Sequence, residues 1–287
     1  MTTPERKYYL VTGASRGLGI GLVQQLLGRP ETTVIAAVRD IESASPRLLA
    51  LPNEKQNTLI IEKLDSANDD DALTVLESLK EIHQIPHLDV IIANAGMSQE
   101  KASAAVVRKQ AMRDHFNVNA IAVLLLYQAT KPLLRSGGKF VAISSTSGSI
   151  LDVAARPSSN IAYGSSKAAL NYIIRKIYFQ DKDLITFPVH PGWVQTDMGN
   201  SSARKQGLEQ APVTVEESTR GILDLIDNAT RENSNRFLDY NGDEVPWSTC
   251  ISYLLDLAIE VVSRNVVVYN LHQLRTLTKS MIINHRV

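Results

Sequence analysis

A tyrosine and a lysine four residues apart could provide acid catalysis. Tyr163 and Lys167 lie in a helical pattern over 160–180, and their spacing places the phenol and the ammonium on one face of a helix. A nearby cation favours a phenolate, so we expect Lys167 to lower the Tyr163 pKa from its ordinary value of roughly 10. Reduction of a carbonyl needs such an acid, because negative charge develops on the substrate oxygen and must meet O–H donors there.

The same spacing recurs nine residues later, in Tyr172 and Lys176. At about 100° per residue, nine residues turn a helix by roughly 180°, so the second pair faces away from the first. Tyr163 lies at the start of the helix among small residues, whereas Tyr172 lies among isoleucines, as expected of a packing or interface residue. We therefore predict that Tyr163 and Lys167 face the cleft.

Two other polar positions could join this pair. A strand over 139–144 runs into a serine-rich turn, and parallel strands place ligands at their carboxyl ends, so the hydroxyl of Ser144 or Ser145 could reach a substrate. The alternative is a serine turn without a catalytic role. Asn119 lies within an apolar helix and must find a partner if it is buried; the alternative is a local bond within its own helix.

A glycine-rich loop follows the first strand and opens a helix. It contains Gly13, Gly17 and Gly19, with Ser15, Arg16 and Leu18 between them. Glycines allow a tight turn and a close approach to a pyrophosphate, whose charge suits the helix N-terminus. The loop lacks both the GxGxxG and the GxxxxGK[ST] spacing, which argues against ATP or GTP. A plain strand-to-helix turn is the alternative.

The end of the second strand indicates which dinucleotide is bound. Arg39 stands where NAD-binding units place an acidic residue, and Asp40 follows it. Two guanidinium groups, those of Arg39 and Arg16, suit the 2′-phosphate of NADP through charge-assisted hydrogen bonds. We therefore predict NADP(H). Asp40 leaves NAD as one alternative, and in another the two arginines are solvated surface residues that bind no cofactor.

Short apolar runs alternate with helical patterns along the chain and predict an α/β fold. This Rossmann-type, doubly wound sheet is mainly parallel, with about seven strands and helices on both faces. The strands are expected at 8–12, 33–38, 57–64, 88–93, 139–144, 184–189 and 237–240. The helices are expected at 17–28, 69–82, 108–134, 160–180 and 215–227. We predict one NADP-binding domain over 1–247 and a helical C-terminal extension over 248–287.

Composition excludes several classes of function. The 287 residues carry 30 basic and 30 acidic side chains, so no basic excess is available for nucleic acid. The single cysteine, Cys250, and the absence of a secretory signal predict a cytoplasmic protein. The longest uncharged run, 115–130, is too short for a membrane span. Pro86 separates His83 from His87, so we expect no metal site.

Taken together, these motifs resemble the classical short-chain dehydrogenase/reductase family. The resemblance rests on TGxxxGxG over 12–19, Asn94-Ala95-Gly96, the serine turn, YxxxK and PGxxxT over 191–196, in the family's order. Two departures are present. Ala93 replaces the first Asn of the family's NNAG, and eighteen positions separate Ser145 from Tyr163 because of an enlarged loop around 150–160. Such a loop can shape substrate choice without changing the chemistry.

The resemblance implies a role for each site residue. Tyr163 would donate the proton, Ser145 would bind the carbonyl oxygen, Lys167 would bind the nicotinamide ribose, and Asn119 would hold a water for proton relay. The cofactor would contact Gly13, Ser15, Arg16, Gly17, Leu18, Gly19, Arg39, Asp65, Asn94, Tyr163, Lys167, Val194 and Thr196. Within these roles, Asp65 would lie near the adenine, and Val194 and Thr196 would hold the nicotinamide.

The activity implied is NADPH-dependent reduction of a ketone or aldehyde. The sequences of the serine turn and of the 239–247 ending are similar to those of fungal ketoreductases. This similarity suggests a ketone derived from a polyketide as the substrate. The same residues could oxidise an alcohol with NAD, and a regulator could use the fold to bind a dinucleotide without turnover. A small-molecule carbonyl is the expected partner, and the protein could form a homodimer or homotetramer.

Overall fold

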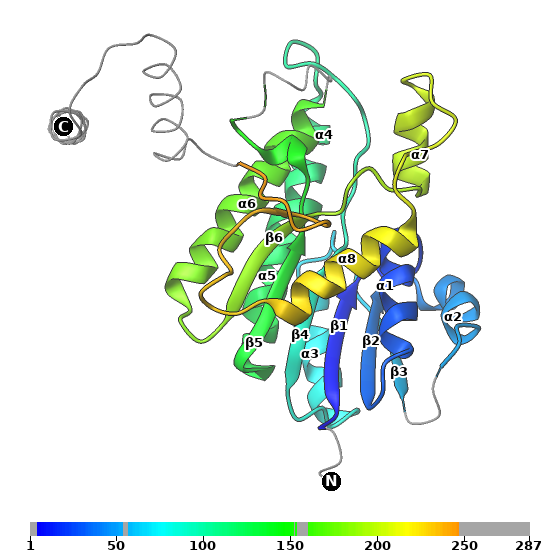
Figure 1. The fold of residues 1–287 in the computed structure, drawn as a ribbon, viewed down its shortest axis with the longest axis vertical. Coiled ribbons are helices and arrows are strands. Elements are labelled where there is room, and N and C mark those ends of the chain that lie inside the picture. The colour runs from blue at the N-terminus through cyan, green and yellow to red at the C-terminus, as the bar shows by residue number, and fades with distance from the viewer. Residues whose placement is uncertain (1–4, 54–56, 152, 154–159, 247–287) are drawn as a thin grey trace, which may run out of the picture. The chain divides into compact units, whose positions relative to one another are not determined.

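The computed structural model describes residues 5–53, 57–151, 153 and 160–246 (Figure 1). The C-terminal extension predicted over 248–287 lies outside the described residues and stays a prediction. Most of the enlarged loop around 150–160 lies outside them as well.

One seven-stranded parallel sheet has the order β3-β2-β1-β4-β5-β6-β7 (Figure 1). Its strands are β1 Lys7–Thr12, β2 Thr32–Val38, β3 Thr58–Lys63, β4 Leu88–Ala93, β5 Leu134–Ile143, β6 Ile185–His190 and β7 Leu238–Asp239. The order reverses at β1, which pairs with β2 on one side and with β4 on the other. The predicted doubly wound sheet is confirmed, and doubly wound sheets bind ligands where the strand order reverses.

Helices cover both faces of the sheet, so its central strands are buried on both sides. On one face, α1 Gly17–Leu27, α2 Ile41–Leu49 and α8 Val215–Asn228 contribute to a single apolar cluster. On the other, α3 Asp71–Glu81, α5 Ala122–Thr130 and α6 Ile161–Gln180 contribute to a second one.

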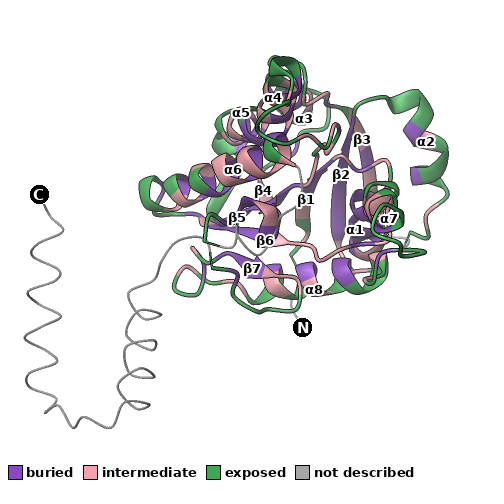
Figure 2. Cartoon of the chain, turned by 90° about the horizontal axis from the view of Figure 1, so that it is seen from above, coloured by how far each residue is buried: buried purple, intermediate pink, exposed green. Residues whose placement is uncertain are grey.

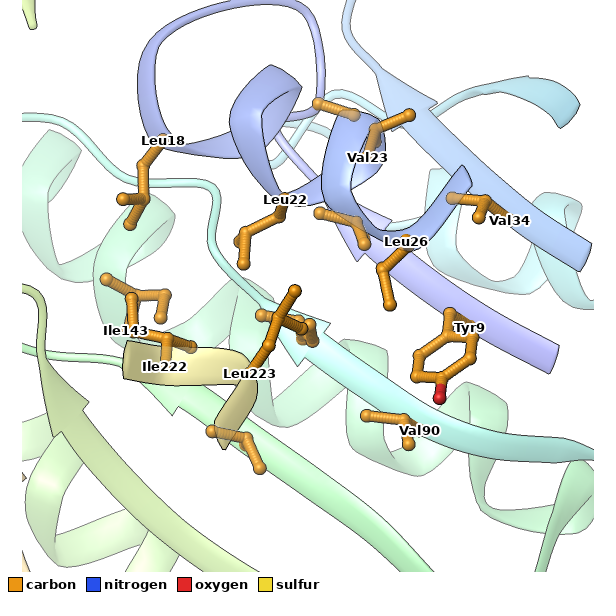
Figure 3. Packing of buried hydrophobic residues seen from close by; sticks show 14 of the residues in the cluster. Tyr9, Leu18, Leu22, Val23, Leu26, Val34, Val90, Ile143, Ile222 and Leu223 are labelled. Atoms are coloured by element: carbon orange, nitrogen blue, oxygen red, sulfur yellow. The ribbon is translucent and has the colours of Figure 1, made fainter. Parts of the chain in front are cut away.

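Successive side chains of β1 point to opposite faces of the sheet, so the strand contributes to both clusters. Tyr9 and Val11 pack in the first cluster, and Leu10 in the second. Figure 3 shows Tyr9 and Leu26 close to Val90 in the first cluster. The central strands are buried and the outer faces of the helices exposed (Figure 2). The sheet is therefore a rigid base for the residues that follow its carboxyl ends.

The long helix expected over 108–134 is interrupted. It consists of α4 Lys109–Phe116, a π-helical turn η1 Asn117–Ile121, α5, and the 3₁₀ turn η2 Lys131–Leu133. A π-helical turn widens the helix by one residue and is frequent at functional sites, and Pro132 cannot continue regular α-helical hydrogen bonding. No helix in the described part of the chain is long and apolar enough to cross a membrane.

Two helices were not predicted. Helix α2 begins at Asp40, whose carboxylate accepts hydrogen bonds from the backbone N–H groups of Glu42 and Ser43. Helix α7, Asp197–Arg204, begins at Thr196, whose hydroxyl accepts one from the backbone N–H of Gly199. Although this stretch is polar and contains glycine, its capped start makes it helical.

Candidate active site

The start of α6 brings Tyr163 to the turn that follows β5. Ser145 accepts a hydrogen bond from the backbone N–H of Ser147 at 3.2 Å, which fixes the first residue of the turn η3 Thr146–Gly148. Burial raises the pKa of Tyr163, and a hydrogen bond with the Ser145 hydroxyl lowers it, with burial the larger effect. The expected direction is therefore wrong for this structure: the phenol is held in its protonated, donating form by burial rather than shifted toward phenolate by Lys167.

Lys167 lies one turn further along α6 and is 3% exposed. Its Nζ donates to the backbone oxygen of Ile143 at 2.7 Å and lies 5.9 Å from the centroid of the Tyr163 ring. Burial lowers the pKa of Lys167 to about 8. This ammonium can therefore lose or take up a proton near neutral pH, unlike an ordinary lysine.

Asn119 lies in η1 with no exposed surface. Its Nδ2 donates to the backbone oxygen of Met97 at 2.9 Å and to the Ser166 hydroxyl at 3.0 Å. Its Oδ1 accepts from the backbone N–H of Met97 at 2.8 Å. All three bonds reach outside its own helix, so the alternative of a locally bonded Asn does not apply.

The backbone at Gly96 lies close to both Asn119 and Lys167. A Cβ added to Gly96 would lie 3.3 Å from Asn119 Oδ1 and 3.5 Å from Lys167 Nζ. The segment after β4 therefore lies close to both side chains, and a glycine there allows the close approach.

The two candidate serines have different environments. The Ser144 hydroxyl donates to Asn171 Oδ1 on α6 at 2.6 Å, and Ser144 is 2% exposed. Asn171 in turn donates to the backbone oxygen of Gly148. The Ser144 hydroxyl is thus used in packing η3 against α6, while the Ser145 hydroxyl meets Tyr163.

The glycine loop is shaped by β4. Asn94 Nδ2 donates to the backbone oxygens of Thr12 at 2.8 Å and Gly13 at 3.3 Å. Gly13 has a positive φ of 63°, and a Cβ on Gly19 would lie 2.2 Å from the Gly13 oxygen. Within the described chain, no side chain caps the N-terminus of α1. Its backbone N–H groups therefore remain available to a phosphate, and the tight glycines fit a dinucleotide.

Three charged residues lie near this loop: Asp40, Arg39 and Arg16. Asp40 is occupied by capping α2, and hydrogen bonds from Ser43, then from Glu42, hold its pKa below the usual range. Arg39 is exposed directly after β2. Arg16 Nη1 lies 3.1 Å from Asp197 Oδ2, with both side chains largely exposed. Two arginines thus lie on the glycine-loop side of the sheet, Arg16 paired with Asp197 at the exposed surface, while Asp40 caps α2.

The remaining predicted cofactor residues surround the same end of the sheet. Thr196 lies against the glycine loop, since its methyl would be 3.1 Å from a Cβ on Gly17. Val194 is buried and forms an isolated bridge with Val213. Asp65 follows β3, and its Oδ1 accepts from the backbone N–H of Ala67 at 3.0 Å. Leu18 is buried at the start of α1, and Ser15 is half-buried in the loop.

Several residues were missed by the sequence reasoning. Ser166 supports Asn119, and His115 bonds the backbone of Gln99 in the segment between β4 and α4. Lys101 Nζ donates to the Ser202 hydroxyl at 2.8 Å, so this segment also contacts α7. The position of His115, four residues before Asn119, was the signal in the sequence that could have indicated a shared helix face.

A family model described as short chain dehydrogenase matches residues 7–207. Among the relatives, the norsolorinic acid ketoreductase of Dothistroma septosporum is 42% identical over 85% of this chain and 93% of its own length. The norsolorinic acid ketoreductase of Aspergillus parasiticus is 42% identical over 85% of this chain and 92% of its own. The solved structure of an NADPH-bound carbonyl reductase from chicken fatty liver aligns with a TM-score of 0.74 at 31% identity, covering 85% of this chain and 100% of that one.

Proposed function

The chain belongs to the short-chain dehydrogenase family, and from this premise we propose that it reduces a ketone or aldehyde to an alcohol with NADPH. The observation that carries the proposal is the Tyr163 phenol, hydrogen-bonded to Ser145 and one helical turn from the buried Lys167. These groups follow β5 and begin α6 at the carboxyl end of the sheet, as does the glycine loop after β1. Acid chemistry and dinucleotide binding thus meet at one edge.

The side chains have complementary roles in the proposed reaction. NADPH, when bound, supplies a hydride to the carbonyl carbon. Tyr163 and Ser145 donate hydrogen bonds to the carbonyl oxygen, and the phenol proton passes to that oxygen as its negative charge develops. Lys167, with its pKa near 8, stabilises the phenolate that remains and binds the ribose. Asn119 fixes the Gly96–Met97 backbone beside Lys167. At this place Asn119 would hold the water of the proton relay.

The preference for NADPH over NADH rests on Arg39 and Arg16. Both are exposed on the glycine-loop side, whereas Asp40 is used in its own helix cap. The solved structures similar to this chain include a carbonyl reductase with NADPH bound and a short-chain dehydrogenase/reductase with NADP bound.

Charge reversal at Arg39 tests the cofactor assignment. We expect Arg39→Glu to raise the KM for NADPH by about tenfold or more, because a charge-assisted hydrogen bond contributes about 1.5–3 kcal/mol. The KM for NADH should change little. Steady-state kinetics with both cofactors measure the ratio, and equal effects on the two would overturn the assignment.

For the substrate we propose a polyketide-derived aromatic ketone, supported by the names of the two fungal relatives. The test is incubation of the protein and NADPH with a panel of aromatic polyketide ketones, read by mass spectrometry for a gain of two hydrogens. The Tyr163→Phe variant is the matched control. NADPH binding without reduction of any carbonyl compound would favour the non-catalytic regulator instead.

Compartment and assembly are further proposals. The single cysteine among 287 residues suits a reducing, cytoplasmic environment, and the family resemblance suggests a homodimer or homotetramer. Light scattering of the purified full chain measures the assembly, and imaging of a tagged chain in cells locates it.

A further inference from the structure

His115 lies in the last turn of α4 and has no exposed surface. Its Nδ1 lies 2.7 Å from the backbone oxygen of Ala111, and its Nε2 lies 3.1 Å from the backbone nitrogen of Gln99. Both ring nitrogens are therefore engaged, one within the helix and one with the segment between β4 and α4.

The two partners determine the protonation state of the ring. The Ala111 carbonyl oxygen can only accept, so Nδ1 must carry a proton. The Gln99 backbone N–H can only donate, so Nε2 must be unprotonated. Only the neutral Nδ1–H tautomer satisfies both bonds, and a proton added at Nε2 would face the Gln99 N–H and break that bond.

His115 and Asn119 contact the same segment from one helical face. Asn119 holds the Met97 backbone through both its N–H and its oxygen, and His115 holds Gln99 two residues later. Gly96, directly before this doubly held stretch, lies beside Lys167. The same segment reaches the start of α6, where the Ile161 N–H donates to the Ala102 oxygen.

We propose that neutral His115 is a positioning residue for the reductase reaction, which it serves by holding Gln99 so that the backbone at Gly96 and Met97 stays in place beside Lys167. The proposal rests on the proposed function. Loss of the Gln99 bond would loosen the segment that lies beside Asn119 and Lys167 and contacts the helix of Tyr163.

Charged neighbours of His115 come from three sides. Glu100, in the held segment, interacts electrostatically with His115 and is itself paired with Arg108 before α4. Asp114 precedes His115 on its own helix and accepts from Gln110. Helix α6, which carries Lys167 and Tyr163, packs against α4.

Two substitutions separate the two bonds of the ring. His115→Gln places an amide oxygen near Nε2 and keeps an acceptor for Gln99 that does not titrate. His115→Asn keeps a group near Nδ1 that can donate to Ala111 but leaves Gln99 without its acceptor. The measurement is kcat/KM against pH for the full chain with NADPH and a reducible ketone, together with the Kd for NADPH.

His115→Gln should keep kcat/KM near the wild-type value, because it retains an acceptor for the Gln99 N–H. His115→Asn should be slower at every pH by roughly fivefold, the effect of one lost hydrogen bond, with the Kd for NADPH unchanged in both variants. Equal behaviour of the two variants, whether both are slow or both are as fast as the wild type, would overturn the proposal.

A second measurement needs neither turnover nor a variant. The ¹⁵N chemical shifts of the His115 ring, assigned in the wild-type protein, distinguish the two neutral tautomers. The Nδ1–H form at neutral pH supports the proposal, and an Nε2–H or doubly protonated ring contradicts it. A wild-type protein that reduces no ketone would instead count against the proposed function and leave this measurement meaningful.

Discussion

Helix α6 carries two Tyr-x-x-x-Lys pairs with the same spacing and opposite surroundings. Tyr163 is hydrogen-bonded to Ser145, and Lys167 is 3% exposed. Tyr172 is 67% exposed, and Lys176 is exposed as well. The difference teaches that the chemistry belongs to burial and to the neighbouring strand ends, and that the spacing provides only a shared helix face.

Removing the two phenol hydroxyls is the most severe test of this comparison. We expect Tyr163→Phe to lower kcat by about 10⁴-fold, since it removes the proton donor of the reaction. Tyr172→Phe should leave kcat unchanged, because that side chain is mostly in solvent. The rate of NADPH consumption gives kcat, and NADPH fluorescence checks that both variants still bind the cofactor. Equal losses in the two variants would end the distinction between the pairs.

The two lysines sharpen the comparison through stability. We expect Lys167→Met to lower kcat by about 10³-fold and, at the same time, to raise the free energy of unfolding at neutral pH. Burial lowers the Lys167 pKa to about 8, whereas a lysine in an unfolded chain titrates at about 10.4. The difference corresponds to a penalty of roughly 3 kcal/mol for the buried ammonium below pH 8.

The sign of the pH dependence follows from proton counts. Between about pH 8 and pH 10 the unfolded chain binds more protons at this position than the folded one, so raising the pH stabilises the wild-type fold. Denaturant unfolding across this range should show a rise that Lys167→Met lacks and Lys176→Met retains. A Lys167→Met protein that is less stable at neutral pH would show that the ammonium is well compensated in the fold.

Substitutions of the adjacent Ser145 and Ser144 should have smaller effects, the first on kcat and the second on stability. Ser145→Ala should lower kcat by about 10²-fold with little loss of stability, because it removes one donor to the developing oxyanion. Ser144→Ala should leave kcat near the wild-type value and cost about 1–3 kcal/mol of stability, because it leaves Asn171 Oδ1 buried without its donor. Kinetics and unfolding measured on both variants test the pair, and an exchange of the two outcomes would move the substrate contact to Ser144.

The sequence predicted the strands and the face of α6 well because both depend on local periodicity. The limits of β4 match the prediction. Tyr172 lies away from the site, as nine residues of helical rotation require, but it is exposed and not packed within this chain as its isoleucine neighbours suggested. Helix α2 was missed because Asp40 was interpreted as a candidate for a ribose hydroxyl, while its carboxylate caps the helix.

Effects that depend on tertiary burial could not be predicted in the same way. The expected lowering of the Tyr163 pKa considered only the neighbouring cation, whereas the depth of the site decides the direction. The interruption at Asn119 and the contacts of His115 with Gln99 require the segment after β4 to lie against the helix, and no pattern of spacing contains that information.

The hydrogen bonds from Asn94 to the glycine loop also affect when this loop can fold during synthesis of the chain. They join residues 81 and 82 positions apart, so the loop acquires its shape only after β4 has settled beside β1. Such long-range contacts form after their loop-closure entropy has been overcome. During synthesis, a nascent chain that ends before Asn94 should therefore lack a formed dinucleotide cradle, and one that ends before Tyr163 should have the cradle strands without the proton donor.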